Sequence, residues 1–308
     1  MKRPLLITRR YAARIAETGM GGLVQALFAL GRSLGPERAS DFGGALARRV
    51  GPLLPVHRTT MANLKAAYPE RGEADLRAIA LKAWENLGRT AGEYPHLGTL
   101  FDFDPERPDA GRIEVDGVDD FVALRDDDQP GLIFSAHLAN WELPAICAAR
   151  FGLNATAVFR APNDQAVARI IQDVRSQTMG NLEAARSGAA FAMQGVLERG
   201  GHLGMLIDQH FTRGVLVQFK GRPALVNPLL GKFARHFECP VHGVRVIRLP
   251  DHRFRLQLTP RLDLPRDPDG AVNVQGAMQA MTSVVEGWVN EHPEQWLWMH
   301  RRWRVPSA

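Results

Sequence analysis

Short β-like runs alternate with helical patterns along most of the chain, and this alternation constrains the fold more than any other feature. Apolar runs from residue 113 onward predict strands at 113–115, 131–135, 155–159, 203–207, 215–219, 240–249 and 253–258. Helical patterns stand between several of them, at 141–150, 165–178, 189–199, 228–237 and 274–290. This order predicts an α/β fold, with a single mixed sheet flanked by helices. Functional residues are expected where its strands end and loops begin.

The N-terminal third has a different texture, and we predict a helical region at 1–97 followed by an α/β catalytic domain at 98–308. Residues 1–60 contain ten basic and three acidic side chains and therefore carry a charge of +7. The whole chain has a net charge of +5, so the remainder carries −2. Such an asymmetry points to an anionic surface, either nucleic acid or phospholipid headgroups, unless this is a solvated basic face without a partner.

An apolar segment at residues 20–30 lies between arginines. Eleven helical residues cover roughly 16 Å, about half the thickness of a bilayer core, so the segment is short for a membrane span. A basic helix of this kind can lie in the membrane interface. A core helix of the soluble domain and a secretory signal peptide are the alternatives, although no clear cleavage site follows.

His137 and Glu142 form the chemical constellation that the sequence offers. His137 follows the apolar run 131–135, and Asn140 and Pro144 indicate a turn that begins the next helix. A turn is required, because residues five apart in one helix point away from each other. We expect Glu142 to accept a hydrogen bond from His137, which leaves the other ring nitrogen as a general base. Neither a Gly-x-Ser-x-Gly elbow nor a suitably placed cysteine supplies a nucleophile, which favours direct attack by a substrate hydroxyl.

The arginines, tryptophans, histidines and cysteines give weaker indications of function. The arginines Arg160 and Arg175 suit a phosphorylated acceptor, or else form ordinary ion pairs. Tryptophans interleaved with basic residues at 296–304 suit a membrane interface better than nucleic acid. Four scattered histidines, at 202, 210, 236 and 242, lack zinc-motif spacing, so no metal is expected. Two cysteines cannot build a disulfide framework, which indicates a reducing compartment.

The stretch His137-Leu-Ala-Asn-Trp-Glu142 resembles the His-x4-(Asp/Glu) signature of the bacterial lipid A biosynthesis acyltransferases, the late lauroyl and myristoyl transferases. Further blocks similar to that family follow in order: Phe159–Asn163, Arg175 with Gly180, Leu206–Gln209, Phe219–Ala224 and Pro293–Trp303. Lys220 replaces a family phenylalanine, Ala136 stands where asparagine is common, and the apolar N-terminal helix is shorter than a typical family anchor.

The resemblance implies a glycerolipid-acyltransferase-like fold with an N-terminal membrane-associating extension, on the cytoplasmic face of the inner membrane. It implies acyl transfer from acyl carrier protein to a hydroxyl of a lipid A precursor of the Kdo-bearing lipid IVA type, without a metal or organic cofactor and without nucleic acid. His137 and Glu142 are then catalytic. The expected substrate-binding residues are Asn140, Trp141, Arg160, Asn163, Arg175, Asp208 and Gln209.

Three alternatives stay open: another lipid acceptor such as an aminolipid or glycolipid, a metal-dependent hydrolase, and a catalytically silent membrane-surface protein. A hydrolase would need two or three further metal ligands that converge on His137 and Glu142. The acyl length cannot be predicted, because an apolar cavity formed by non-adjacent residues measures it.

Overall fold

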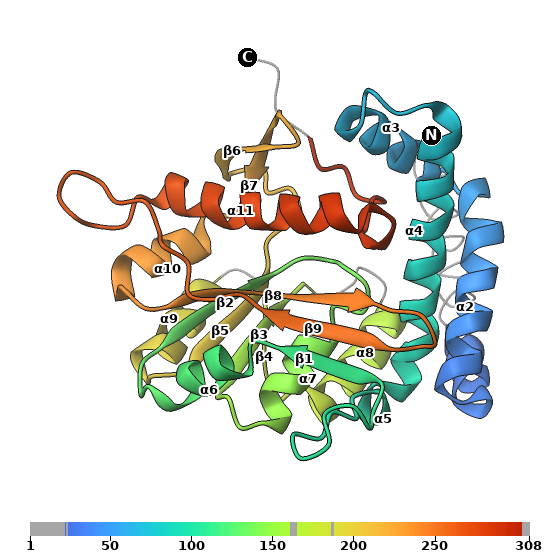
Figure 1. Cartoon of the computed structure of the whole chain (residues 1–308), viewed down its shortest axis with the longest axis horizontal. Coiled ribbons are helices and arrows are strands. Elements are labelled where there is room, and N and C mark those ends of the chain that lie inside the picture. The colour runs from blue at the N-terminus through green and yellow to red at the C-terminus, as the bar shows by residue number, and fades with distance from the viewer. Residues whose placement is uncertain (1–21, 23, 161–164, 186–187, 304–308) are drawn as a thin grey trace, which may run out of the picture.

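The computed structural model describes residues 22, 24–160, 165–185 and 188–303. Within these ranges seven strands form one mixed sheet (Figure 1). Their spatial order is β1 (Ile113–Asp116), β9 (Phe254–Leu258), β8 (Val241–Arg248), β2 (Gly131–Ser135), β5 (His202–Leu206), β3 (Ala155–Phe159) and β4 (Asn181–Ala184). Neighbouring strands are parallel, except that β8 and β9 are antiparallel. The expected α/β fold with a mixed sheet flanked by helices is confirmed, and β4 is an edge strand that the sequence pattern missed.

Helices cover both faces of this sheet (Figure 1). One face carries α9 (Ala189–Glu198), α10 (Leu229–Phe237) and α11 (Val274–Glu291). The other carries α5 (Leu97–Leu100), α6 (Val118–Asp126), α7 (Leu143–Arg150) and α8 (Gln165–Thr178). A hairpin of β6 (Val215–Phe219) and β7 (Arg222–Val226) packs on α11.

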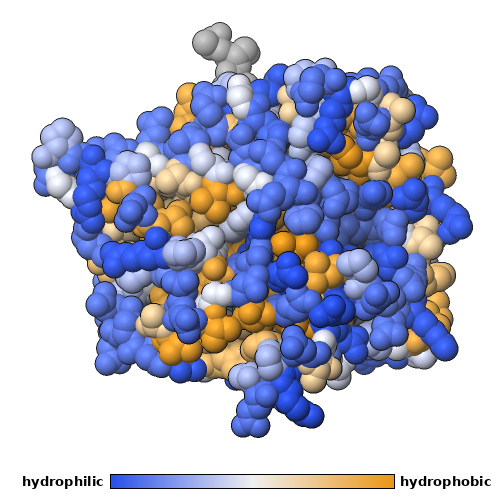
Figure 2. Space-filling view, in the orientation of Figure 1, coloured by the Kyte–Doolittle hydropathy of each residue, from blue (hydrophilic) through white to orange (hydrophobic). Residues whose placement is uncertain are grey.

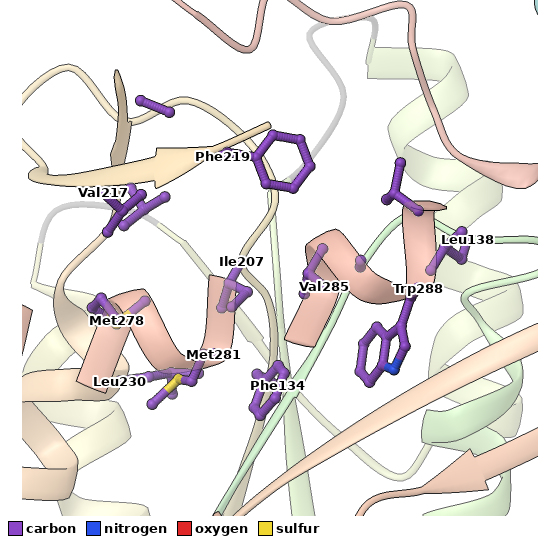
Figure 3. Close-up of a cluster of buried hydrophobic side chains, with 14 of the residues drawn as sticks. Phe134, Leu138, Ile207, Val217, Phe219, Leu230, Met278, Met281, Val285 and Trp288 are labelled. Atoms are coloured by element: carbon purple, nitrogen blue, oxygen red, sulfur yellow. The ribbon is translucent and has the colours of Figure 1, made fainter. Parts of the chain in front are cut away.

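The face under α11 is filled with large side chains (Figure 3). Successive strand residues point to opposite faces, so Leu132 and Phe134 of β2 enter this core and Ile133 and Ser135 do not. The Phe134 ring stacks on Trp288 of α11, with ring centroids 5.7 Å apart. The close-up shows Met278, Met281 and Val285 continuing this layer along the same helix.

The N-terminal helices are α2 (Pro36–Val50), α3 (His57–Ala67) and α4 (Glu73–Glu93), with residues 24–34 forming another helix before them. The backbones of α2 and α4 touch, because a Cβ on Gly43 would lie 2.2 Å from the Gly88 carbonyl oxygen. Leu64 of α3 and Ala80 of α4 belong to the same hydrophobic cluster as α11, so these helices share a core with the sheet. The boundary at residue 97 remains a prediction.

No helix in the described ranges is long and apolar enough to cross a membrane. The apolar segment at 20–30 lies partly outside the described residues, as do the first five basic residues of the chain.

Glu93, at the end of α4, joins the N-terminal helices to the sheet. This carboxylate is 2% exposed and accepts hydrogen bonds from Ser40 (2.7 Å), from Asn140 (2.8 Å) and from both terminal nitrogens of Arg248 on β8. Arg248 also donates to Asn86 of α4 (3.0 Å). The network therefore connects α2, α4 and β8 with the loop that follows β2.

We expect Glu93→Ala to lower the free energy of unfolding by about 3–5 kcal/mol, because it leaves the Arg248 guanidinium buried without its counter-charge. The matched control is Glu85→Ala on the same helix, where a half-buried carboxylate pairs with Arg48 and Arg89 and the loss should stay near 1 kcal/mol. Urea unfolding of both variants measures the difference. Equal losses in the two variants would contradict this view of Glu93.

Candidate active site

His137 and Asp208 meet because they follow adjacent parallel strands by the same distance. Ser135, the last residue of β2, is in register with Leu206, the last residue of β5. Each chain then leaves the sheet, and the functional side chain stands two residues later. The Nδ1 atom of His137 lies 2.7 Å from Oδ1 of Asp208.

The Asp208 carboxylate is buried, at 1% exposure, and accepts three hydrogen bonds. Besides the His137 ring, the His137 backbone N–H (2.8 Å) and the Trp296 indole N–H (2.7 Å) both donate to Oδ2. Burial alone raises the pKa of this carboxyl, but His137 and the other donors outweigh burial and hold the pKa well below its usual range. Asp208 is therefore an anion that fixes the proton of His137 on Nδ1 and leaves Nε2 to accept another.

The C-terminal segment completes the loop that carries His137. Leu138 and Trp296 form an antiparallel bridge, and the Leu297 N–H donates to the His137 carbonyl oxygen (3.1 Å). The side chains of Trp296, Trp298 and Arg302 are each at most 1% exposed. The prediction that this tryptophan-rich stretch lies at a membrane interface was wrong for these three residues, because their side chains pack inside the domain.

Glu142 has a different partner from the one that its spacing predicted. The structure pairs its two carboxylate oxygens with Nε (2.9 Å) and Nη2 (2.6 Å) of Arg175 on α8, and the Tyr94 hydroxyl donates to Oε1 (3.2 Å). The expected hydrogen bond from the His137 ring to Glu142 is replaced by the bond to Asp208. The reason is topological, because adjacent parallel strands bring Asp208 to Nδ1, whereas α8 brings a cation to Glu142.

Burial and the nearby Glu142 carboxylate both shift the pKa values of Tyr94 and Arg175. Burial raises the pKa of Tyr94 far above its ordinary value, and the nearby Glu142 charge adds to the rise. Burial by itself lowers the pKa of Arg175, but Glu142 more than compensates and the net shift is upward. The Glu142–Arg175 ion pair ties the loop after β2 to α8.

The remaining predicted site residues lie in three different settings. Trp141, Arg160 and Gln209 line the same cavity as His137, and the Gln209 amide nitrogen is 3.4 Å from the His137 Nε2 atom. Asn140 is fully buried: its Nδ2 donates to Glu93, and its Oδ1 accepts from the Glu142 N–H (3.3 Å), which supports the predicted turn. Asn163 lies outside the described residues.

A cavity of about 530 Å³ extends from these polar residues along the sheet face opposite α11. His137, Glu142, Arg160, Arg175 and Gln209 stand at one end. Its walls are mainly apolar side chains from the sheet and from α6 and α7: Val115, Phe121, Leu124, Ile133, Ala148, Leu153, Ala155, Ala157, Val244 and Leu256. A cavity with mainly apolar walls and a group of polar side chains that includes His137 fits a hydrocarbon chain that carries a polar group.

A model of the family described as bacterial lipid A biosynthesis acyltransferase matches residues 9–305. This chain is a member of that family. The lipid A biosynthesis myristoyltransferase of Escherichia coli (strain K12) is 23% identical over 262 residues, which cover 83% of this chain and 77% of the relative. Membership of this family identifies the chain as an acyltransferase.

Neither cysteine suits a covalent acyl-enzyme step in this acyltransferase. Burial raises the pKa of the Cys147 thiol to about 12 and that of Cys239 to about 11, so both are protonated near neutral pH. In the described part of the chain, no three His, Cys, Asp or Glu side chains are grouped to hold a metal ion. The further ligands that a metal hydrolase would need beside His137 and Glu142 are thus not found there.

His300 gives the stability of the protein a pH dependence that can be measured. Its Nε2 lies 3.2 Å from the Asp208 carbonyl oxygen, and burial lowers its pKa from 6.5 to about 4. Between these two pH values, His300 is protonated in the unfolded chain and neutral in the folded protein. The free energy of unfolding is therefore unaffected by protonation of His300 above pH 6.5, and it falls by up to about 3 kcal/mol as the pH approaches 4.

We expect His300→Asn to flatten the decrease in the free energy of unfolding between pH 6.5 and pH 4.5, as measured by urea unfolding at a series of pH values. His236→Asn, at the end of α10, is the matched control and should keep the wild-type slope. The same slope in His300→Asn as in the wild type would contradict the assignment.

Proposed function

We propose that this acyltransferase moves a fatty acyl chain from acyl carrier protein to a hydroxyl of a lipid A precursor of the Kdo-bearing lipid IVA type. One observation carries the proposal: Nε2 of a His137 ring that Asp208 holds stands at the polar end of an apolar cavity. The activity stated in the name of the Escherichia coli relative, myristoyl transfer in lipid A biosynthesis, supports the same chemistry.

The reaction follows from the geometry of the His137–Asp208 pair. The Nε2 atom takes the proton of the acceptor hydroxyl as its oxygen bonds to the thioester carbonyl carbon. The imidazolium that forms is stabilised by the Asp208 carboxylate. The tetrahedral intermediate then collapses, the carbon–sulfur bond breaks, and the leaving thiolate takes the proton back from Nε2. Donor and acceptor are bound together, and no acyl-enzyme forms.

The oxyanion of that intermediate needs hydrogen-bond donors. The Glu142 N–H, which precedes α7, donates to Asn140 Oδ1 and is already used. We assign the role to the side-chain amide of Gln209, which stands beside Nε2 at the cavity end. Arg160, exposed at the same end, is the cation that we propose for an acidic acceptor. Arg175 stays a predicted acceptor contact, although its guanidinium already binds Glu142.

We expect His137→Ala and Asp208→Asn each to lower the rate of acyl transfer by about 10²- to 10⁴-fold, because one removes the base and the other removes the charge that stabilises its protonated form. The assay is transfer of a labelled chain from acyl carrier protein to a lipid A precursor, with an aminolipid and a glycolipid as alternative acceptors.

Asp128→Asn, at an exposed turn with φ 55°, is the matched control and should keep full activity. Thermal melts establish that each variant is folded. The mechanism is wrong if His137→Ala keeps more than roughly a tenth of the wild-type rate, or if labelled acyl-protein accumulates in a single turnover. Preference for the aminolipid or glycolipid would overturn the assignment of the acceptor.

We further propose that α2 rests on the cytoplasmic face of the inner membrane. Its inner face packs on α4, while the outer side and the turn after it expose Phe42 (45%), Leu46 (40%), Val50 (42%), Leu53 (81%) and Leu54 (42%). Apolar atoms reach the surface along the edge of the molecule where Figure 1 places α2 (Figure 2). The exposed Arg38, Arg49 and Arg58 lie among them, which suits anionic headgroups above an apolar contact.

The double variant Phe42→Asp, Leu53→Asp should weaken binding of the full chain to vesicles containing anionic phospholipid by at least about tenfold, because two apolar contacts are lost and two like charges face the lipid. Phe191→Asp on α9, where the phenylalanine is 82% exposed, is the matched control and should bind normally. Co-sedimentation measures both variants. Undiminished binding of the double variant would place the membrane contact elsewhere.

A further inference from the structure

Gly204 is a glycine in the middle of a central strand with open space where its side chain would be. It lies on β5, in register with Ile133 of β2 and Ala157 of β3. A Cβ built on Gly204 meets no atom within 4 Å. The contrast with Gly243 of β8 is clear, since a Cβ there would lie 2.6 Å from the Phe134 ring.

Neither backbone conformation nor packing therefore accounts for glycine at position 204. The residue has no left-handed φ, and no neighbour fills the space above it. Glycine inside a strand gives up side-chain packing and costs chain entropy, and it is typical of places where a ligand approaches the backbone closely. Gly204 lines the cavity that begins at His137, so the open space belongs to that cavity.

The register fixes how deep Gly204 lies. Ser135 and Leu206 form the layer nearest His137, and Ile133, Gly204 and Ala157 form the next layer. Ala155, in register with His202, belongs to the layer beyond that. Each layer is two residues, or about 7 Å, deeper along the strands. A side chain at position 204 would thus project across the cavity between its polar end and its deepest part.

We propose that the absence of a side chain at Gly204 sets the length of the acyl chain that the enzyme accepts. The inference rests on the proposed acyl transfer, and it adds the residue that determines which donor is used. A chain whose thioester carbonyl lies near His137 Nε2 must pass the Gly204 layer to reach Ala155. Side-chain carbon atoms added at position 204 would occupy the space that carbon atoms of the acyl chain occupy in the wild type.

The experiment is a series, Gly204→Ala, Gly204→Val and Gly204→Leu, assayed with acyl carrier protein carrying saturated chains of increasing length. We expect Gly204→Leu to lower kcat/KM for the longest chain that the wild type accepts by at least about 100-fold, because several methylene groups lose their place. A chain about four carbons shorter should keep its rate within about threefold, since the added side chain occupies about that volume. The Ala and Val variants should fall between.

Two further variants keep the result interpretable. Ala157→Leu enters the same layer from β3 and should shift the chain-length preference in the same direction, which matters if Gly204→Leu does not fold. Gly287→Leu on α11, another glycine whose Cβ would meet no atom within 4 Å, is the matched control and should keep the wild-type preference.

The outcomes separate the two proposals. Equal losses for all chain lengths, or an unchanged preference in both Gly204→Leu and Ala157→Leu, would overturn the role of Gly204 and leave acyl transfer standing. A wild-type protein that transfers no chain of any length would overturn the proposed function and this inference together.

Discussion

The site depends on one buried carboxylate. Asp208 can be ionised inside the protein only because three N–H groups converge on it, from the His137 ring, the His137 backbone and the Trp296 indole. These donors come from two segments that are far apart in sequence. The same contacts therefore stabilise the fold, hold the imidazole in one orientation and leave its Nε2 atom free to accept a proton.

The sheet separates its two tasks by the size of its side chains. On β2, Leu132 and Phe134 face α11 and fill the core, whereas Ile133 and Ser135 face the cavity. Alanines on β3 and Gly204 on β5 continue the smaller surface. A strand has a period of two, so a single sheet can be packed tightly on one face and remain hollow on the other.

The sequence predicted the α/β class, most strands and the place of His137, because these depend on local pattern. It chose the wrong partner for His137, since spacing along one segment cannot show that β2 and β5 are neighbours. A usable signal was present: Asp208 follows its strand by the same two residues as His137. Trp296 and Trp298 were also misread, because tryptophans beside arginines look alike in a buried turn and at a membrane surface. The cavity and the open space at Gly204 depend on several strands, so no local pattern could reveal them.

The bridge between Leu138 and Trp296 has a consequence for synthesis of the protein. The ribosome makes His137 and Asp208 long before it makes the indole that binds the carboxylate. Until residues 295–297 leave the exit tunnel, the loop after β2 lacks its backbone hydrogen-bond partners Gln295 and Leu297. The Asp208 carboxylate also lacks the hydrogen bond from the Trp296 indole. In the nascent chain, His137 is therefore present before the hydrogen bonds around it are complete. The hydrogen bonds that orient His137 and Asp208 are therefore complete only after residues 295–297 have been added and have folded back onto the loop after β2.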